Sequence, residues 1–271
     1  MCPISVVIIT QNEEANIREC IRSAKLLSQD VVIVDAESTD ATLFIAQREG
    51  ARVFTKKWET YGAARNFGAQ QAHNNWIVAL DADERITESL VGQIKQLSFT
   101  DPQVVYRFRR HNFLGRKKIT FGTLAFEKVS RLYHRSACAW DLTLVHECLE
   151  GAPVKKKIIK GYINHFGLKD LADHRKKATR YAQLCADKYF MAQKKATLVK
   201  CILSPLFNAT KSYLFAGGFL TGKDGFQLAK NILYYSWLKY SLLRSRYALE
   251  REMVNQELPQ MEPVRESIFS S

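Results

Sequence analysis

The amino-acid sequence predicts an α/β protein, with a doubly wound mixed sheet in its first part and a helical extension at its end. Over the first 100 residues, short β-branched runs alternate with segments of helical periodicity, which is the pattern of parallel strands covered by helices. Beyond Asp170 the helical spacing continues without intervening strands. With 271 residues, 46% of them hydrophobic, the chain is long and apolar enough for one large domain or two small ones.

Four segments are expected to form the parallel part of the sheet. Residues 4–10 (ISVVIIT) and 31–36 (VVIVDA) are continuous apolar runs, as expected for strands buried on both faces. Further strands are predicted at 51–58 and 76–84. Helices are predicted between these strands, at residues 12–27, 38–50 and 60–74. In such a sheet, ligands bind at the carboxyl ends of the strands.

The pattern changes near residue 100. From there to residue 168 the apolar segments are shorter, alternating and basic, which favours mixed or antiparallel strands. We therefore predict a domain at 1–168 and a basic amphipathic helical region at 169–250. The remaining residues, 251–271, contain two prolines in a polar stretch and are expected to form a flexible tail.

Positive charge is concentrated in the middle and later chain. The net charge is +13, yet residues 1–100 hold 10 Lys/Arg against 13 Asp/Glu, whereas residues 101–250 hold 28 against 10. This excess favours phosphates, nucleic acid or an anionic membrane as partner, a merely solvated basic face being the alternative. No nucleic-acid-binding motif is present, and the basic residues are interleaved with long apolar helices, so we expect no nucleic-acid partner.

The cysteines and the first residues favour a cytosolic protein. The six cysteines are scattered without a C-x-x-C pair, so we expect reduced thiols rather than a disulfide framework or a zinc site. The chain opens without a basic region, and its first apolar run is too short for a signal peptide, so we expect no secretory signal.

The segment WIVALDADE, residues 76–84, ends an apolar strand in three carboxylates within four positions. Asp81 and Asp83 at a strand tip can hold a divalent cation, which can in turn hold a diphosphate. Asp35 ends the second predicted strand in the same way, within IVDAESTD. The alternative is that these carboxylates form turns and helix caps. Neither strand is followed by a glycine-rich dinucleotide fingerprint or a P-loop.

Four segments in order, SVVIITQNEEANI, VVIVDAESTDAT, GAARNFGA and VALDADE, resemble the family 2 glycosyltransferases of GT-A fold. This resemblance covers about the first 90 residues and implies that residues 1–168 form a GT-A nucleotide-sugar-binding and catalytic domain. In one departure, the chain has Asp35-Ala36 where the family often has Asp-Ser. The resemblance implies seven donor-site roles: Thr10 and Glu13 near the nucleotide, Asp35 on the base, Arg65 and Asn66 flanking the pyrophosphate, Asp81 facing the ribose, and Asp83 ligating a divalent cation, Mn²⁺ or Mg²⁺.

Two later segments extend the resemblance. WDLTLVHECLEG, residues 140–151, is similar to the family segment with the catalytic carboxylate, here Glu147. GYINHFG is similar to a segment whose histidine, here His165, can reach the metal. His146 is expected to orient the acceptor. From the residues alone, a surface carboxylate for Glu147 and a core or turn histidine for His165 stay open as alternatives.

These residue types can perform sugar transfer with inversion. A cation offsets the charge of the leaving diphosphate, and Glu147 can accept the proton of the acceptor hydroxyl. One base with an activated leaving group permits a single displacement, so an α-linked nucleotide sugar would give a β-glycoside, as the resemblance also implies.

The later segments and the basic helices look most like bacterial enzymes that add β-1,4-linked glucose to a heptose of the lipopolysaccharide inner core. This implies a nucleotide-sugar donor, UDP-glucose, a lipid-anchored saccharide acceptor, and a cytoplasmic protein peripheral on the inner face of the cytoplasmic membrane. Another cell-envelope acceptor, a nucleotidyltransferase acting on a sugar phosphate, and a non-catalytic membrane-binding module stay open. The acidic segment TQNEEAN after the first strand disfavours the nucleotidyltransferase, which usually has a basic, glycine-rich segment there.

Residues 197–222 form the most apolar long stretch of the chain. A bilayer-spanning helix needs roughly 20 predominantly apolar residues, and because Lys200, Pro205 and Lys211 interrupt this stretch, we expect no span. We expect the segment to pack partly on the catalytic domain and partly on an anionic membrane surface, with a buried helical hairpin as the alternative. The residues expected at the lipid surface are the aromatics Phe207, Tyr213, Phe215 and Phe219 and the lysines Lys194, Lys195, Lys200 and Lys211.

Overall fold

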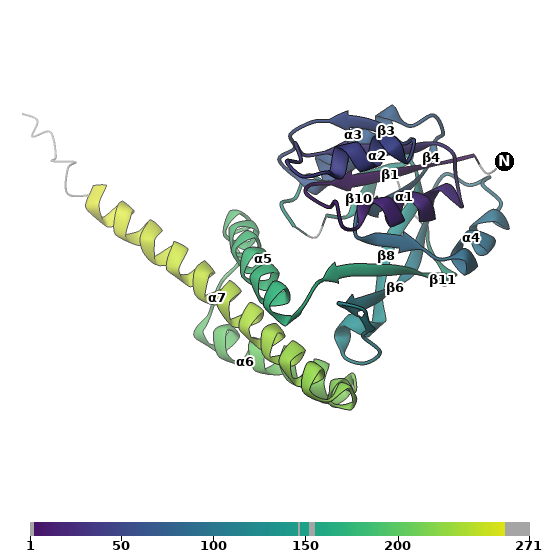
Figure 1. The fold of residues 1–271 in the computed structure, drawn as a ribbon. Helices are drawn as coiled ribbons and strands as arrows, with labels where there is room; N and C mark the ends of the chain where they lie inside the picture. Colours follow the sequence, from purple (N-terminus) through teal and green to yellow (C-terminus); the bar gives the residue numbers. More distant parts are fainter. Residues whose placement is uncertain (1–2, 146, 152–154, 258–271) are drawn as a thin grey trace, which may run out of the picture.

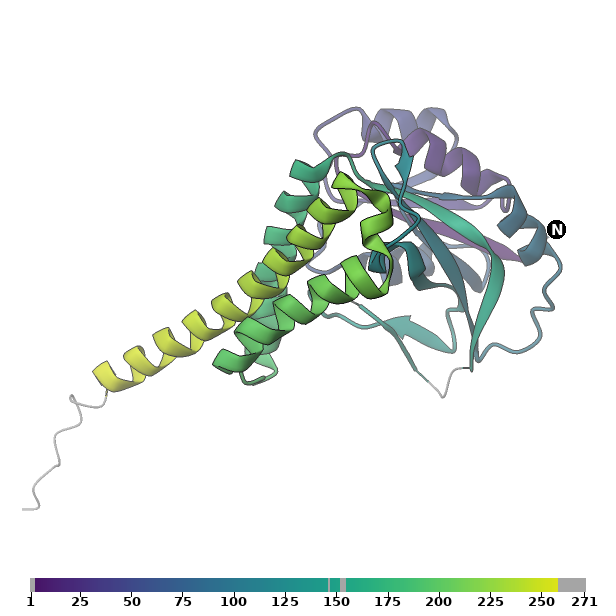
Figure 2. The same ribbon diagram turned by 90° about the horizontal axis from the view of Figure 1, so that it is seen from below.

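A computed structural model of the protein describes residues 3–145, 147–151 and 155–257 (Figure 1). The expectation for His146, and that for the tail beyond residue 257, lie outside the described residues. Within them the predicted fold class is confirmed: a mixed sheet with helices on both faces is followed by a helical extension (Figures 1 and 2).

The first half of the sheet is parallel, as the apolar runs predict. Its strands are β1 (Ile4–Thr10), β2 (Val31–Asp35), β3 (Arg52–Thr55) and β4 (Trp76–Asp81), in the spatial order β3-β2-β1-β4. All seven residues of β1 are buried, because helices cover both faces of this central strand. The register pairs Thr10 with Asp35 and Ile9 with Asp81, so the carboxyl ends of β1, β2 and β4 lie at one edge of the sheet.

The second half of the sheet is mixed. It adds β5 (Glu84–Ile86), β6 (Val104–Leu114), β7 (Lys117–Lys118), β8 (Glu127–His134) and β11 (Lys155–Leu168). Strand β8 is antiparallel to both β4 and β6, and β11 lies parallel to β6 and antiparallel to β5. A 3-10 turn, η1 (Thr123–Phe126), precedes β8, and β9 (Cys138–Trp140) and β10 (Leu149–Gly151) form a separate antiparallel pair.

Four helices bury the two faces of the sheet. They are α1 (Ile17–Lys25), α2 (Thr42–Arg48), α3 (Tyr61–Gln71) and α4 (Glu88–Lys95). One core cluster joins α1, α2 and α4 to the sheet, and a second joins α3 to the opposite face. Helix α3 lies so close to the sheet that a Cβ on Gly68 would come within 2.8 Å of Val34 Cγ2. This close approach fixes the distance between α3 and the strand tips.

The helical extension follows β11. It consists of α5 (Leu171–Met191), α6 (Leu198–Thr210), the π-helical turn η2 (Lys211–Phe215), the 3-10 turn η3 (Gly218–Thr221) and α7 (Lys223–Glu257). Helix α7 lies beside α5 and α6 and runs out from the sheet domain (Figures 1 and 2). It continues to Glu257, beyond the predicted start of the tail, because no helix-breaking residue occurs before Pro259.

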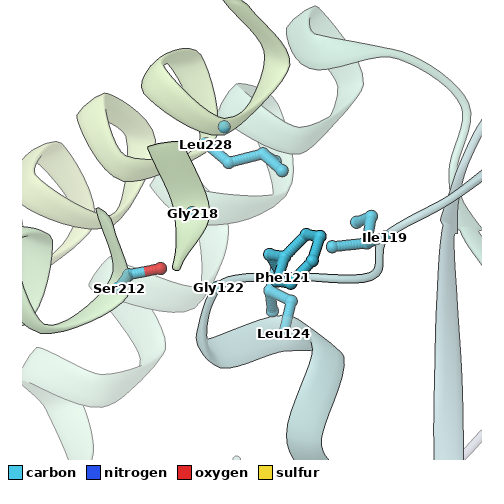
Figure 3. A pocket seen from close by; sticks show the side chains of 8 residues that line it. Ile119, Phe121, Gly122, Leu124, Ser212, Gly218 and Leu228 are labelled. Atoms are coloured by element: carbon cyan, nitrogen blue, oxygen red, sulfur yellow. The ribbon is translucent and has the colours of Figure 1, made fainter. Parts of the chain in front are cut away.

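The extension is attached to the sheet domain at η1 and at the residues just before it. The Gly122 N–H donates to the Ala216 carbonyl oxygen at 2.8 Å, and the Thr123 N–H donates to Ser212 Oγ at 3.2 Å. Beside these bonds, the side chains of Phe121 and Leu124 face Leu228 of α7 across a small hollow (Figure 3). Within the described part of the chain, no helix is long and apolar enough to cross a membrane.

Candidate active site

The carboxylates of the DAD segment stand where β4 ends and β5 begins. Asp81 is the last residue of β4, and Glu84 is the first of β5. The fully buried Glu84 carboxylate accepts a hydrogen bond from the Asp81 N–H at 3.1 Å, which closes the turn. Asp83 is therefore held at the edge where the carboxyl ends of β1 and β2 also lie, as the strand pattern predicts.

Two buried arginines hold Asp81. Arg65 from α3 contacts Oδ1, and Arg131 from β8 donates from Nη2 to Oδ2 at 2.6 Å. The same Arg131 nitrogen also lies 2.6 Å from Glu84 Oε1. Burial opposes ionisation of Asp81, but the charges of Arg131 and Arg65 more than offset it and lower the pKa of Asp81 well below its usual range. Asp81 is a fixed negative charge in this site.

Asp83 and His165 face each other across the edge of the sheet. His165 Nε2 lies 3.5 Å from Asp83 Oδ2, because β11 pairs with β5 in the register that places His165 opposite Glu84. A Cβ on Gly167 would come within 2.7 Å of Asp83 Oδ2 and closer still to His165 Nε2. Only glycine leaves the space between the two side chains open.

The hydrogen bonds of Asn112 on β6 fix the tautomer of His165. The Asn112 amide nitrogen donates to the Leu124 carbonyl oxygen at 2.6 Å and to Glu127 Oε2 at 2.7 Å. Its amide oxygen is therefore left to accept from His165 Nδ1, at 2.6 Å. In a neutral imidazole this leaves the Nε2 lone pair directed at Asp83, which is the arrangement in which a histidine binds a metal.

The residues present fit a divalent cation at this position. Asp83 Oδ1 is buried and has no hydrogen-bond partner among the described residues. Burial raises the pKa of Asp83, but the charge and the hydrogen bond of a protonated His165 lower it by more, so the net shift is downward and the carboxylate is available as a ligand. The described ranges contain no group of three or more His, Cys, Asp or Glu side chains able to hold a metal. Asp83 and His165 can thus supply two ligands, and a bound diphosphate could supply others.

Glu147 joins the same site from the loop between β9 and β10. Its Oε1 atom lies 3.4 Å from Arg65 Nη2, so one arginine contacts both Glu147 and Asp81. Arg65 also lies over the Trp140 ring, 4.9 Å from its centroid. In the part of the chain that the structure describes, Arg65 Nε and Nη1 are buried without a hydrogen-bond partner. The hydrogen-bonding capacity of these two nitrogens is therefore unused within the described site.

The other predicted donor residues differ in the hydrogen bonds that their side chains make. Thr10 is 3% exposed, and its hydroxyl has no hydrogen-bond partner within the described ranges. The Glu13 carboxylate accepts from Asn16 Nδ2 at 2.8 Å, and its pKa is raised, chiefly by burial. Asp35 is fully buried and accepts from the N–H and the hydroxyl of Ser38.

Asn66 is engaged on both sides of its amide. Its Nδ2 donates to the Trp140 carbonyl oxygen at 2.8 Å, and its Oδ1 accepts from the Trp140 N–H at 2.9 Å. Asn66 thereby holds β9, and with it the tryptophan on which Arg65 rests. Its predicted contact with the pyrophosphate stays a prediction.

Helix α5 contributes residues that the sequence reasoning did not single out. Lys177 donates to the Gly167 carbonyl oxygen, and its charge lowers the pKa of Asp83. Tyr181 is 39% exposed; its partial burial and then the neighbouring Tyr61 and site carboxylates raise its pKa. The sequence indicated a basic helix after the last strand, but its pattern did not show that Lys177 and Tyr181 lie near the site.

Comparisons with known proteins identify the family of the chain. The family model for Glycosyl transferase family 2 matches residues 5–162. The chain is 26% identical to an uncharacterized glycosyltransferase of Rickettsia typhi over 94% of this chain and 91% of that one. It is 27% identical to the lipopolysaccharide core biosynthesis glycosyltransferase LpsC of Rhizobium meliloti over 92% of this chain and 94% of that one.

A solved structure, glucosyl-3-phosphoglycerate synthase from Mycobacterium tuberculosis with Mn²⁺, UDP and glucosyl-3-phosphoglycerate, is 25% identical. The match covers 42% of this chain and 45% of that one, with a TM-score of 0.35. The family match, by contrast, includes the DAD segment, Arg65 and Arg131 and covers most of the sheet, and it decides against the nucleotidyltransferase and the non-catalytic module. The chain belongs to glycosyl transferase family 2, with a GT-A fold.

Proposed function

We propose that the protein transfers glucose from UDP-glucose, with inversion, to a heptose of the lipopolysaccharide inner core or a similar lipid-anchored acceptor at the inner face of the cytoplasmic membrane. The observation that carries the proposal is the Asp83–His165 pair, open between its side chains and next to the arginine-bound Asp81 and Glu147. The relative named as a lipopolysaccharide core glycosyltransferase, similar over nearly the whole chain, supports this acceptor class.

The donor diphosphate belongs beside Asp83 and His165 in this proposal. Bound Mn²⁺ or Mg²⁺ would offset the negative charge that develops on the leaving diphosphate. Arg65 presents two unpartnered N–H donors within the described site and can bind a phosphate oxygen. Asp81 would then face the ribose, while Thr10, Glu13, Asp35 and Asn66 would complete the nucleotide pocket.

Glu147 is the proposed general base. The acceptor hydroxyl oxygen attacks the anomeric carbon as the carbon–oxygen bond to the diphosphate breaks, and the hydroxyl proton passes to Glu147. Its carboxylate lies on the same arginine as Asp81, so base and donor site are held by one side chain. A single displacement of this kind inverts the anomeric configuration.

Release of UDP from UDP-glucose tests the proposal. Purified protein is incubated with Mn²⁺, UDP-glucose and a lipid A–core acceptor that ends at the inner-core heptose, and the product is analysed by mass spectrometry and by NMR of the new linkage. We expect UDP release that requires both acceptor and cation, and a β-linked hexose on the acceptor. UDP-galactose and UDP-N-acetylglucosamine serve as control donors. No transfer from UDP-glucose, or an α-linked product, would contradict the proposal.

A further inference from the structure

Helix α6 exposes apolar residues and buries small or polar ones. Cys201 and Pro205 are buried, and Asn208 Nδ2 donates to Ser236 Oγ of α7 at 3.0 Å, so this side of the helix packs against α7. The large apolar residues of α6 and η2 are instead 51–80% exposed, and we name this set the α6 face: Leu198, Ile202, Leu203, Leu206, Phe207 and Phe215. An amphipathic helix of a water-soluble domain normally has the reverse polarity.

The spacing shows that the α6 face is continuous. Leu198, Ile202 and Leu206 follow one another at intervals of four residues and form one row along the helix. Leu203 and Phe207 form a second row beside it, in which Leu203 is a neighbour of Leu206 at a spacing of three. Phe215, in the turn η2 directly after α6, is 80% exposed and adds a further apolar side chain. Scattered exposed apolar residues are ordinary, but a contiguous group of this size marks an interaction surface.

The charge around the α6 face indicates its partner. Residues 188–223 contain six lysines and no aspartate or glutamate. Lys194, Lys195, Lys200 and Lys211 are all exposed. A second copy of the chain would present the same positive charges and repel the first, whereas an anionic lipid surface offers both apolar depth and negative charge.

We propose that the α6 face is the docking surface of this protein for an anionic lipid bilayer, on which it lies without crossing it. This inference rests on the proposed function, which supplies the lipid-anchored acceptor. Membrane binding itself can be measured without sugar transfer.

The helical extension links the α6 face to the active site. Helix α5 precedes α6 and donates from Lys177 to the Gly167 carbonyl oxygen and from Lys188 to the Val145 carbonyl oxygen, the latter at 2.9 Å. The turn η2 is bonded to the sheet domain through Ser212 and Thr123, and Ser212 lies beside Gly122 (Figure 3). Docking of the α6 face therefore sets the orientation of the site relative to the lipid surface.

Co-sedimentation of the full chain with vesicles tests the proposal. The wild type is compared with the double variant Leu203→Ser/Phe215→Ser on phosphatidylglycerol/phosphatidylethanolamine vesicles and on phosphatidylcholine vesicles. We expect the wild type to bind the anionic vesicles, to bind less at high salt, and to bind phosphatidylcholine poorly. The double variant should partition at least about ten-fold more weakly, which corresponds to about 1.4 kcal/mol.

Matched control variants distinguish docking through the α6 face from non-specific adsorption to vesicles. Phe44 on α2 is 60% exposed and lies in the sheet domain, so Phe44→Ser should bind vesicles like the wild type. Lys200→Glu/Lys211→Glu should weaken binding, whereas the exposed lysines at the far end of β11 from α5 should not matter, so Lys156→Glu/Lys157→Glu should bind normally.

Thermal shift with UDP-glucose and Mn²⁺ reports the folded state and the donor site independently. A double variant that keeps its melting temperature and donor shift while losing vesicle binding supports the proposal. Vesicle binding without any donor shift in the wild type leaves docking supported and refutes the donor assignment. Equal partition of wild type and double variant overturns the proposal. A wild-type dimer that the double variant converts to a monomer, with no vesicle binding by either, overturns it in favour of a contact between copies.

Discussion

Replacement of Gly167 by alanine should close the space between Asp83 and His165. The backbone at Gly167 is not in the left-handed region, so alanine is conformationally acceptable there. Its Cβ would nevertheless lie within 2.7 Å of Asp83 Oδ2 and closer to His165 Nε2, which forces the imidazole or the carboxylate to move. Overpacking of this kind costs about 1–3 kcal/mol of folding stability.

The effect on cation binding should exceed the effect on stability. Loss of the groups that orient a metal ligand typically lowers metal affinity by about 10–100-fold, and the methyl group displaces a proposed ligand directly. We therefore expect Gly167→Ala to weaken Mn²⁺-dependent UDP binding by at least about 10–100-fold, measured by isothermal titration calorimetry with Mn²⁺ and UDP. The circular dichroism spectrum should remain that of the wild type.

Gly92 provides the matched control for Gly167. It lies within α4, and a Cβ there would meet nothing within 4 Å. Gly92→Ala should leave UDP binding unchanged and stabilise the fold by about 0.5–1 kcal/mol, since glycine is the poorer helix former. Wild-type affinity for Mn²⁺ and UDP in Gly167→Ala would refute the assignment of the cation to this space.

Three further outcomes follow from the contacts of the site and the sheet. Glu147→Gln should lower kcat by about 10²–10⁴-fold with donor affinity little changed, and loss of donor binding instead would count against its role as base. Arg131→Met leaves the partly exposed Asp81 and the buried Glu84 without their shared partner and should reduce the free energy of unfolding by about 3–5 kcal/mol; a urea midpoint unchanged from the wild type would contradict this. Burial of Asp30 is offset by hydrogen bonds from Ser5 and other groups, so its pKa is lowered in the folded state. The lowered pKa means that the ionised carboxylate stabilises the fold at a pH above its unfolded pKa, and that this contribution is lost as pH falls through the folded pKa. Asp30→Asn should therefore flatten the acid limb of the free energy of unfolding plotted against pH. An unaltered slope would contradict this.

The strand tips could be predicted because their signals are local. Continuous apolar runs give β1, β2 and β4, and parallel strands bring Thr10, Asp35 and Asp81 to the same edge of the sheet. Asp83 and His165 are far apart in the sequence, however, and no spacing rule joins them. Only the antiparallel pairing of β5 with β11 does so. Their association came from family resemblance rather than from periodicity.

The supporting residues escaped prediction for a physical reason. Arg131 lies in a basic, alternating segment, where its charge suggested solvent exposure, yet it is 5% exposed because Asp81 and Glu84 neutralise it. Asn112 and Gly167 have no signature of their own, since their importance comes from what they touch: an imidazole nitrogen and an open space. Such roles appear only once the strands are assembled.

In the helical extension, too, the sequence predicted only some of the exposed residues. Phe207, Phe215 and Phe219 are exposed, and their contact with a lipid surface stays a prediction. Tyr213 is only partly exposed and packs edge-on against Phe219 and Phe226. The aliphatic residues of α6, which the sequence did not single out, form most of the exposed surface, because the burial of Cys201 and Pro205 against α7 turns them outward.

The central claim is that Asp83 holds the cation on which donor binding depends, and calorimetric titration of UDP-glucose into Asp83→Ala, with and without Mn²⁺, tests it most directly. The side chain is 16% exposed and its Oδ1 atom has no hydrogen-bond partner in the described structure, so its removal should leave the fold intact. We expect the wild type to bind UDP-glucose more tightly with Mn²⁺ than without it, and Asp83→Ala to show no such difference. Mn²⁺-dependent binding of wild-type strength in the variant would contradict the claim.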